Sequence, residues 1–217
     1  MKRLNWALLT AGMILTGTAF AQIPNMDPKA KVILDEISKK NKAYTSMAVD
    51  FSYTYYNKKN KTNDTQNGKI TIKGQKYKLE IAKQTVFCDG KTVWTYLKDS
   101  KEVQINNMST DDDAINPQNI LSIWEKGYKC KYIKDETVGG AAVQAIDLTP
   151  IKGKKFFKVR LNIDKTKKQV HSAIVYDKTG DTYTYKITKF TPNAPVSDAS
   201  FTFKSSDYPG VEVIDLR

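Results

Sequence analysis

Apolar and polar residues alternate along most of this chain. Between residues 49 and 55 the apolar side chains occupy every second position, as expected for a strand with one buried face. The same period returns over residues 157–163, where lysine, arginine and asparagine stand between the apolar residues. Turn residues such as Asp89-Gly90 separate runs of this kind. The pattern predicts about ten or eleven antiparallel strands.

Two segments show a helical period instead. Asp27 followed by Pro28 is typical of a helix start, and Asn116-Pro117 predicts a second helix inserted between the strands, with Gly127 at its end. The first helix has apolar residues at helical spacing: Ile33, Leu34, Ile37 and Tyr44. The inserted helix has an apolar side as well: Ile120, Leu121 and Trp124.

The balance of strands and helices predicts the architecture. A sheet with one apolar face must pack against a second sheet or curl around something. Two helices are too few to cover both faces of so large a sheet, but they are about enough to fill the concave side of a curled one. We therefore predict a mainly β fold, an unclosed antiparallel half-barrel whose concave face is covered by the two helices.

The first 21 residues have the features of a secretory leader. Lys2 and Arg3 precede an apolar stretch, and the segment closes on Ala19-Phe20-Ala21, which fits a signal peptidase site. The apolar stretch is short and interrupted, so a retained membrane anchor is less favoured. We expect residues 1–21 to be a signal peptide cleaved before Gln22, residues 22–217 to form a single domain, and the protein to be periplasmic.

The chain is basic, with a formal net charge of +12. Loss of the leader would lower this charge to +10, because the leader contains two cations and no acidic residue. Nearly all the remaining cations are lysines spread along the strands, whereas nucleic-acid-binding proteins concentrate lysine and arginine in one stripe. We expect no nucleic-acid partner, and we assign the charge to anionic phospholipid or an acidic partner.

Few residues are suited to catalysis or metal binding. His171 is the only histidine, and two cysteines cannot complete a four-thiolate site, so we expect no metal, no cofactor and no enzymatic activity. A hydrolase acting on cell-wall material is a minor alternative that would need two carboxylates paired in a cleft. Its scattered candidates are Asp50, Glu80 and Asp89.

The two cysteines allow two interpretations. Export would place Cys88 and Cys130 in an oxidising compartment, where a disulfide between them could form. Two separately buried thiols are the favoured alternative, although the geometry that decides between these states is not given by sequence.

Aromatic residues are frequent on the predicted strands. For any one of them, packing in the core is the plain explanation. As a set they provide more apolar surface than two helices can cover on a concave sheet, so a hydrophobic guest could occupy the remainder. These residues are Phe51, Tyr53, Tyr55, Tyr77, Trp94, Tyr96, Phe157, Tyr183 and Tyr185.

Five segments carry a resemblance to a known family. The most distinctive has the form Asp-Gly-x-x-x-Trp-x-Tyr and begins at Asp89. The others are the leading helix with residues 47–51, the strands at 68–72 and 77–80, the Asn116-Pro117 helix, and residues 201–211. In this order the segments resemble the LolA-like proteins, periplasmic carriers that bring lipoproteins to the bacterial outer membrane. The resemblance covers nearly all of the chain after the leader.

The resemblance implies an unclosed half-barrel whose concave face holds the acyl chains of a lipoprotein. The partners it implies are acylated lipoproteins and an inner-membrane, ATP-driven release complex, with an outer-membrane acceptor that stays unidentified. We expect the carrier to be a monomer. The residues expected to line the lipid site are Phe51, Tyr53, Ile72, Tyr77, Leu79, Trp94, Tyr96, Ile120, Trp124, Phe157, Val159 and Leu161.

One position departs from the family pattern. The family often has an arginine and a proline after the strand that here ends at Ile72-Lys73, and this chain has Gly74 and Gln75 instead. Where that arginine helps to hold a lid closed, another residue would have to replace it. An alternative function for the same fold is a module that senses lipid or unfolded outer-membrane proteins and regulates an envelope stress pathway.

Overall fold

The structure is a computed structural model that describes residues 26–108 and 121–217. Within these residues, twelve strands form one sheet. The first six are β1 (Met47–Asn57), β2 (Thr62–Lys73), β3 (Lys76–Ile81), β4 (Gln84–Cys88), β5 (Thr92–Leu97) and β6 (Glu102–Asn107). The others are β7 (Tyr128–Val138), β8 (Ala141–Pro150), β9 (Phe156–Asp164), β10 (Gln169–Asp177), β11 (Thr182–Pro192) and β12 (Glu212–Asp215).

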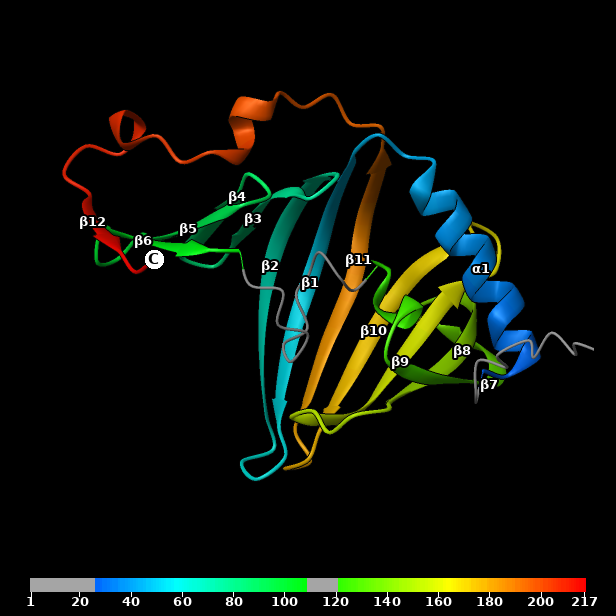
Figure 1. Cartoon of the computed structure of the whole chain (residues 1–217). Coiled ribbons are helices and arrows are strands. Elements are labelled where there is room, and N and C mark those ends of the chain that lie inside the picture. The colour runs from blue at the N-terminus through cyan, green and yellow to red at the C-terminus, as the bar shows by residue number, and fades with distance from the viewer. Residues whose placement is uncertain (1–25, 109–120) are drawn as a thin grey trace, which may run out of the picture.

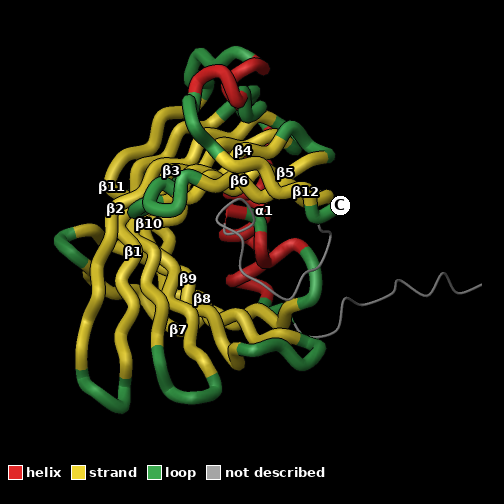
Figure 2. Tube along the Cα trace, turned by 90° about the vertical axis from the view of Figure 1, so that its left-hand side faces the viewer, coloured by secondary structure: helices red, strands yellow, loops and turns green. Residues whose placement is uncertain are grey.

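The sheet is curled and unclosed. Its strand order is β12-β6-β5-β4-β3-β2-β1-β11-β10-β9-β8-β7, so β12 and β7 are its two edges. All neighbours are antiparallel except β12 and β6, which are parallel. Figure 2 looks along the curl and shows the concave side. The predicted fold class is confirmed, with one short strand, β12, that the sequence pattern did not predict.

The leading helix α1 (Pro28–Lys42) lies on the concave side, over β7 to β10 (Figure 1). The Asp27 side chain accepts hydrogen bonds from the backbone N–H groups of Lys29 and Ala30, at 2.8 and 3.1 Å, which satisfies donors that have no partner inside the helix. One side of α1 is buried against the sheet through Ala30, Ile33, Leu34 and Ile37. The predicted start and apolar face of this helix are confirmed.

The inserted helix is shorter in the described residues than predicted. Its predicted start at Asn116-Pro117 lies outside the described residues, and the described part of the segment contains one turn of 3-10 helix, η2 (Ile123–Glu125). The side chain of Trp124 is buried in the same core as α1. No helix in the described part of the chain is long and apolar enough to cross a membrane.

The chain after β11 covers the outer face of the sheet at β4 and β5. It contains two short 3-10 helices, η3 (Asp198–Phe201) and η4 (Ser205–Asp207), before β12. The Phe203 ring centroid lies 6.1 Å from that of Phe87, and the Tyr208 ring centroid lies 4.5 Å from that of Tyr96. These rings form a second apolar cluster, on the face opposite to α1.

Candidate functional site

The register of the sheet brings apolar residues together on the concave face of β1 to β5. One row across the strands joins Val49, Ile70, Leu79 and Val86. A second row lies two residues away from the first on β1 to β4 and continues onto β5; it joins Met47, Ile72, Tyr77, Cys88 and Val93. Because alternate residues point to the same face of a sheet, both rows face the side on which α1 lies. All these residues pack in or against the core that contains the buried face of α1.

The concave face has two halves that differ in burial. Beneath α1, the apolar residues of β8 and β9 are fully buried: Ile146, Leu148, Val159, Leu161 and Ile163. On β1 to β5 and β11, many apolar residues of the same face are only partly buried: Tyr53, Leu79, Ile81, Val86, Val93, Tyr185 and Ile187. We call the first set the covered half and the second set the open half.

Tyrosines line the open half where β1 meets β11. The ring centroids of Tyr53 and Tyr185 are 5.1 Å apart, and those of Tyr55 and Tyr183 are 5.2 Å apart. Burial raises the pKa of both the Tyr53 and the Tyr185 hydroxyl, so both stay neutral and keep a donor proton at physiological pH. The tyrosine rings therefore make this part of the open half apolar, and the hydroxyl groups at the ring edges can form hydrogen bonds.

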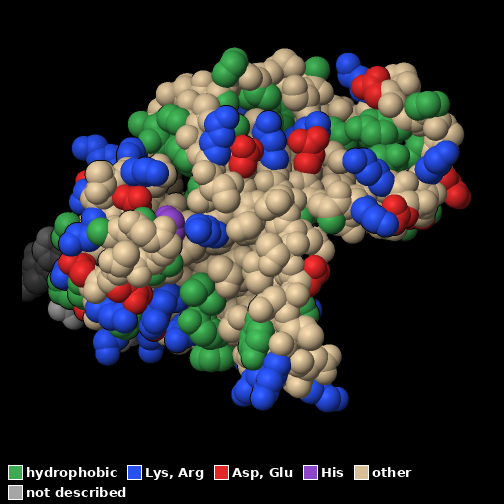
Figure 3. Space-filling view, turned by 180° about the vertical axis from the view of Figure 1, so that it is seen from behind, with side chains coloured by type: hydrophobic (Ala, Val, Ile, Leu, Met, Phe, Trp, Pro, Cys, Tyr) green, Lys and Arg blue, Asp and Glu red, His purple; other side chains and the backbone are tan. Residues whose placement is uncertain are grey.

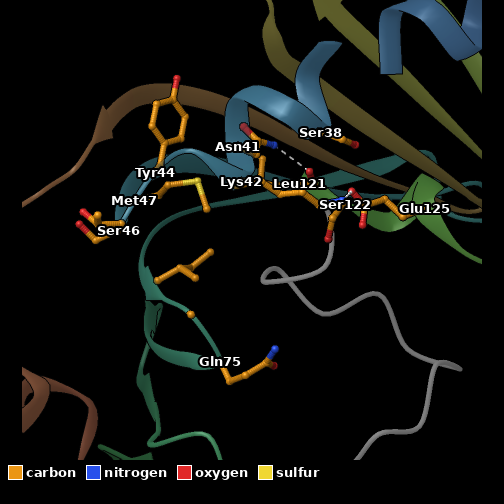
Figure 4. A pocket seen from close by; sticks show the side chains of 13 residues that line it. Ser38, Asn41, Lys42, Tyr44, Ser46, Met47, Gln75, Leu121, Ser122 and Glu125 are labelled. Atoms are coloured by element: carbon orange, nitrogen blue, oxygen red, sulfur yellow. Dashed lines mark hydrogen bonds and ion pairs between the residues drawn. The ribbon is translucent and has the colours of Figure 1, made fainter. Parts of the chain in front are cut away.

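A cavity of about 390 Å³ opens at the end of the curl where α1 finishes and β1 begins. Met47, Ile72 and Leu121 give it an apolar wall, and Ser46 and Gln75 are among the polar residues around it. Figure 4 shows α1 and residues 121–125 on one side of this cavity and Gln75 on the other. The cavity therefore combines apolar residues of the concave face with a polar rim.

Residues 121–125 are fixed to α1 by polar contacts. The Asn41 side-chain amide donates to the Leu121 carbonyl at 2.9 Å, and the Trp124 ring N–H donates to the Ser38 hydroxyl at 2.9 Å. An ion pair of 2.9 Å joins Lys42 to Glu125.

The pKa of the Glu125 carboxyl reflects these contacts. Burial alone would raise it, but hydrogen bonds from Lys42 and Ser38 outweigh burial and leave it below its ordinary value. Glu125 is therefore charged at neutral pH, and its ion pair helps to hold this side of the cavity in place.

The opposite rim of the cavity is the turn between β2 and β3. Lys73 and Lys76, on either side of this turn, donate to the two carboxylate oxygens of Asp198 at 2.7 and 2.8 Å. These hydrogen bonds, with the attraction of the two ammonium groups, hold the pKa of Asp198 at about 2. Gly74 has a φ of +59°, which favours glycine. The turn that lacks the family's arginine is thus tied to η3 through lysines.

Most of the predicted lipid-site residues lie on the concave face. Phe51, Tyr53, Ile72, Tyr77 and Leu79 are on β1 to β3, in or beside the open half. Val159, Leu161 and Trp124 belong to the core around α1, where they are buried. Ile120 lies outside the described residues.

Two predicted residues on β5 face the other way. The register pairs Val93, not Trp94, with Cys88, so Trp94 and Tyr96 point to the outer face with Phe87. Tyr96 packs there on Tyr208. The expectation that these two residues lie near the concave face is wrong, because both faces of β5 are apolar and the bulkier residues occupy the outer one.

Phe157 is also outside the concave face. The pairing of β9 with β10 shifts at this point, from Asp177 opposite Phe156 to Tyr176 opposite Lys158, which leaves Phe157 as an extra residue. Phe157 is 50% exposed and its ring lies 6.1 Å from that of Tyr176, whereas Phe156 is buried in the core. Alternation predicted the opposite, because a period of two cannot reveal a bulge.

The residues that the sequence missed are the smaller apolar ones of the open half. They are Ile81, Val86, Val93 and Ile187. The signal that could have found them is the turn at Asp89-Gly90, since a hairpin there places Val93 opposite Cys88 on the face of Tyr77.

Both cysteines are buried free thiols. Cys88 is on β4 and Cys130 is on β7, and seven strands of the sheet lie between β4 and β7. Burial raises the pKa of the Cys130 thiol to about 11 and also raises that of Cys88. Of the two states that the sequence allowed, the structure has the separate thiols, which are neutral and have little reactivity.

The three candidate carboxylates of a hydrolase do not meet in one cleft. Asp50 and Glu80 border a shallow groove of about 380 Å³ on the outer face, with Lys69 of β2 between their strands. Asp89 lies in the turn between β4 and β5, where its side chain accepts hydrogen bonds from the backbone of Lys91 and Thr92.

Comparisons with known proteins agree with the architecture. The family model described as outer membrane lipoprotein carrier protein LolA matches residues 42–204. An uncharacterized conserved protein from Thermus thermophilus has the same fold, with a TM-score of 0.59 and 12% identity, over 86% of this chain and 99% of that one. No curated protein sequence resembles the chain closely enough to count as a match.

Two further solved structures are more distant. One is a putative outer membrane lipoprotein-sorting protein domain from Vibrio parahaemolyticus, with a TM-score of 0.48 and 12% identity over 80% of this chain and 96% of that one. The other is LprF from Mycobacterium bovis, with a TM-score of 0.49 and 14% identity over 80% of this chain and 97% of that one.

Proposed function

The chain belongs to the LolA family of outer membrane lipoprotein carrier proteins, and from this premise we propose that it carries lipoproteins through the periplasm. The acyl chains of the cargo would lie against the open half of the concave face. The protein would have no catalytic activity of its own.

The observation that carries this proposal is the contrast between the two halves of the concave face. Leu148, Val159 and Leu161 are sealed beneath α1, whereas Leu79 and Val86 of the same face are only half-buried. An apolar surface that the chain's own helix does not seal is suited to an apolar ligand.

The energetics of the cargo fit this surface. Each methylene moved out of water contributes about 0.8 kcal/mol, so a sixteen-carbon acyl chain exposed to water costs on the order of 12 kcal/mol. A carrier must shield such a chain and also release it. A partly open wall that includes Tyr53 and Tyr185 lets rings contact the chain while hydroxyl groups stay close to water.

The proposal includes a route and its partners. Residues 1–21 would direct export and be removed before Gln22. Transfer of acyl chains out of a membrane requires energy, and we infer that an inner-membrane, ATP-driven complex supplies it. The carrier would then pass its cargo to an acceptor at the outer membrane.

The experiment that tests the proposal is native mass spectrometry of the protein isolated from the cell envelope, followed by solvent extraction of any ligand. We expect a fraction of the protein to carry an acylated guest that extraction removes. Repeated isolation of guest-free protein from cells that make lipoproteins would contradict the proposal. A stable complex with a membrane regulator, without transfer of lipoprotein between membranes, would favour the sensor alternative.

A further inference from the structure

The turns at one end of the sheet are rich in lysine. In an antiparallel sheet, alternate turns lie at the same end of the strands. Five turns share the end at which β1 finishes, and they contain ten lysines and two aspartates, a net charge of +8 from ten minus two. They are residues 58–61, 82–83, 98–101, 151–155 and 178–181. We call these five turns the basic end.

The opposite end is much less charged. Its turns contain four lysines and one aspartate, a net charge of +3. They are residues 43–46, 74–75, 89–91, 139–140 and 165–168. The turns are therefore more basic at one end of the sheet than at the other.

Three turns of the basic end are neighbours in space. The backbone N–H of Lys58, in the turn between β1 and β2, donates to Asp181 at 2.9 Å. Figure 1 shows this turn beside the turn between β10 and β11 at the lower end of the sheet. Phe156, directly after residues 151–155, pairs with Asp177, directly before residues 178–181. Figure 3 shows lysine side chains at the tip of the lowest projection.

Exposed apolar side chains lie among these lysines. Ile151 is 57% exposed and Phe157 is 50% exposed, on either side of Lys152, Lys154 and Lys155. The Phe157 ring packs on Tyr176, whose ring also lies 4.1 Å from the Lys158 ammonium. Ile151 and Phe157 therefore add exposed apolar surface to this part of the basic end.

We propose that the basic end docks the protein on the surface of a bilayer that contains anionic phospholipid. Lysines spread over several turns match a broad, uniformly negative surface, because each acts as a point charge without a fixed partner geometry. Ile151 and Phe157 can enter the headgroup region while the lysines contact phosphates. Docking of this kind is reversible and weakened by salt.

The proposal concerns the turns at one end of the sheet and does not depend on the cargo. Its test is co-sedimentation of the full protein, as isolated from cells, with vesicles made of phosphatidylglycerol and phosphatidylcholine. We expect binding at low salt that is lost at high salt, and no binding to vesicles of phosphatidylcholine alone. Because these vesicles contain no lipoprotein, the result is separate from that of the carrier experiment.

Two triple variants locate the surface. Lys152→Gln, Lys154→Gln and Lys155→Gln together should lower the partition onto anionic vesicles by about a hundredfold, since each lysine contributes roughly a factor of five. The matched control at the opposite end removes the same charge through Lys165→Gln, Lys167→Gln and Lys168→Gln, and we expect a change of about twofold or less. Phe157→Ser should weaken binding without altering its dependence on salt.

Several results would overturn the proposal. One is failure of the unaltered protein to bind anionic vesicles at low salt, and another is an equal loss in the two triple variants. Binding to an acidic polypeptide such as polyglutamate in the absence of any vesicle binding would assign the basic end to an acidic protein instead. Circular dichroism of each variant ensures that the compared proteins are folded.

Discussion

The covered and open halves of one concave face show how a single sheet can serve both stability and binding. Under α1, Val159 and Leu161 are fully buried, and the sheet is part of an ordinary core. Beyond α1, Leu79 and Val86 are equally apolar but only half-buried. The two halves differ in their position relative to α1, which lies over β7 to β10, and in residue type, since tyrosines such as Tyr53 and Tyr185 line the open half. One alternating pattern therefore produces a core in one half and a candidate binding wall in the other.

The largest expected effect is a difference in the free energy of unfolding between a variant of the covered half and a variant of the open half. Leu161→Ala should lower the free energy of unfolding by about 3 kcal/mol, because it leaves a cavity in a sealed core. Leu79→Ala should lower it by about 1 kcal/mol, since the half-buried side chain loses less contact. Urea denaturation followed by circular dichroism measures both values. Equal losses in the two variants would remove the distinction between the halves.

The next effect is a difference in ligand binding between variants on the two faces of β5. Val93→Glu places a charge on the open half and should weaken binding of a fluorescent acyl probe by roughly tenfold or more, because that charge would lie against an apolar ligand. Trp94→Glu places the same charge one residue later, on the outer face, and should leave affinity within about twofold. Circular dichroism is needed for both, and a greater loss for Trp94→Glu would reverse the assignment of the faces.

A smaller effect concerns the boundary between the halves. Trp124→Phe removes the hydrogen bond to Ser38 while keeping most of the buried ring, and should cost about 1 kcal/mol of folding free energy. Ser38→Ala should cost more, because it also removes the hydrogen bond to Glu125, and the double variant should cost little more than Ser38→Ala alone. Additive losses in this cycle would show that the contact does not couple α1 to residues 121–125.

The smallest effect concerns pH and the turn at the cavity rim. The pKa of Asp198 is held at about 2, below its ordinary value, so its carboxylate stabilises the fold above pH about 4, and this contribution is lost as pH falls through about 2. Asp198→Asn should be slightly less stable than the unaltered protein at neutral pH, and the difference should vanish in acid. Urea titrations at several pH values measure it, and a difference that persists unchanged at pH about 2 would exclude this cause.

Much of the fold could be predicted because its signals are local. Asp27 and Pro28 mark the start of α1, and the alternation over residues 49–55 marks β1. β12 was missed, because its four residues pair in parallel with β6 and carry no pattern of their own. Local signals do not show which strands α1 covers. They therefore do not predict that the concave face has a covered half and an open half.

The concave face of the candidate site was predicted less well than the strands. The reason is that the pairing register of the strands decides which residues lie on that face. Tyr77 and Leu79 were assigned correctly to the concave face, since β3 alternates clearly. Trp94 was not, because β5 is apolar on both faces and only its pairing with β4 decides which side is concave. At Phe157 a single extra residue reverses the assignment. Large aromatic side chains were therefore a poorer guide to the concave face than the smaller residues in the same row as Tyr77.

The most direct test of the open half uses a lipopeptide whose acyl chain carries a photoreactive diazirine. After irradiation, mass spectrometry of proteolytic fragments identifies the residues that the chain contacts. We predict crosslinks to the concave side of β3 to β5, at Leu79, Val86 and Val93. Crosslinks confined to the outer face around Trp94 and Tyr96 would contradict the assignment of the open half as the lipid-binding surface.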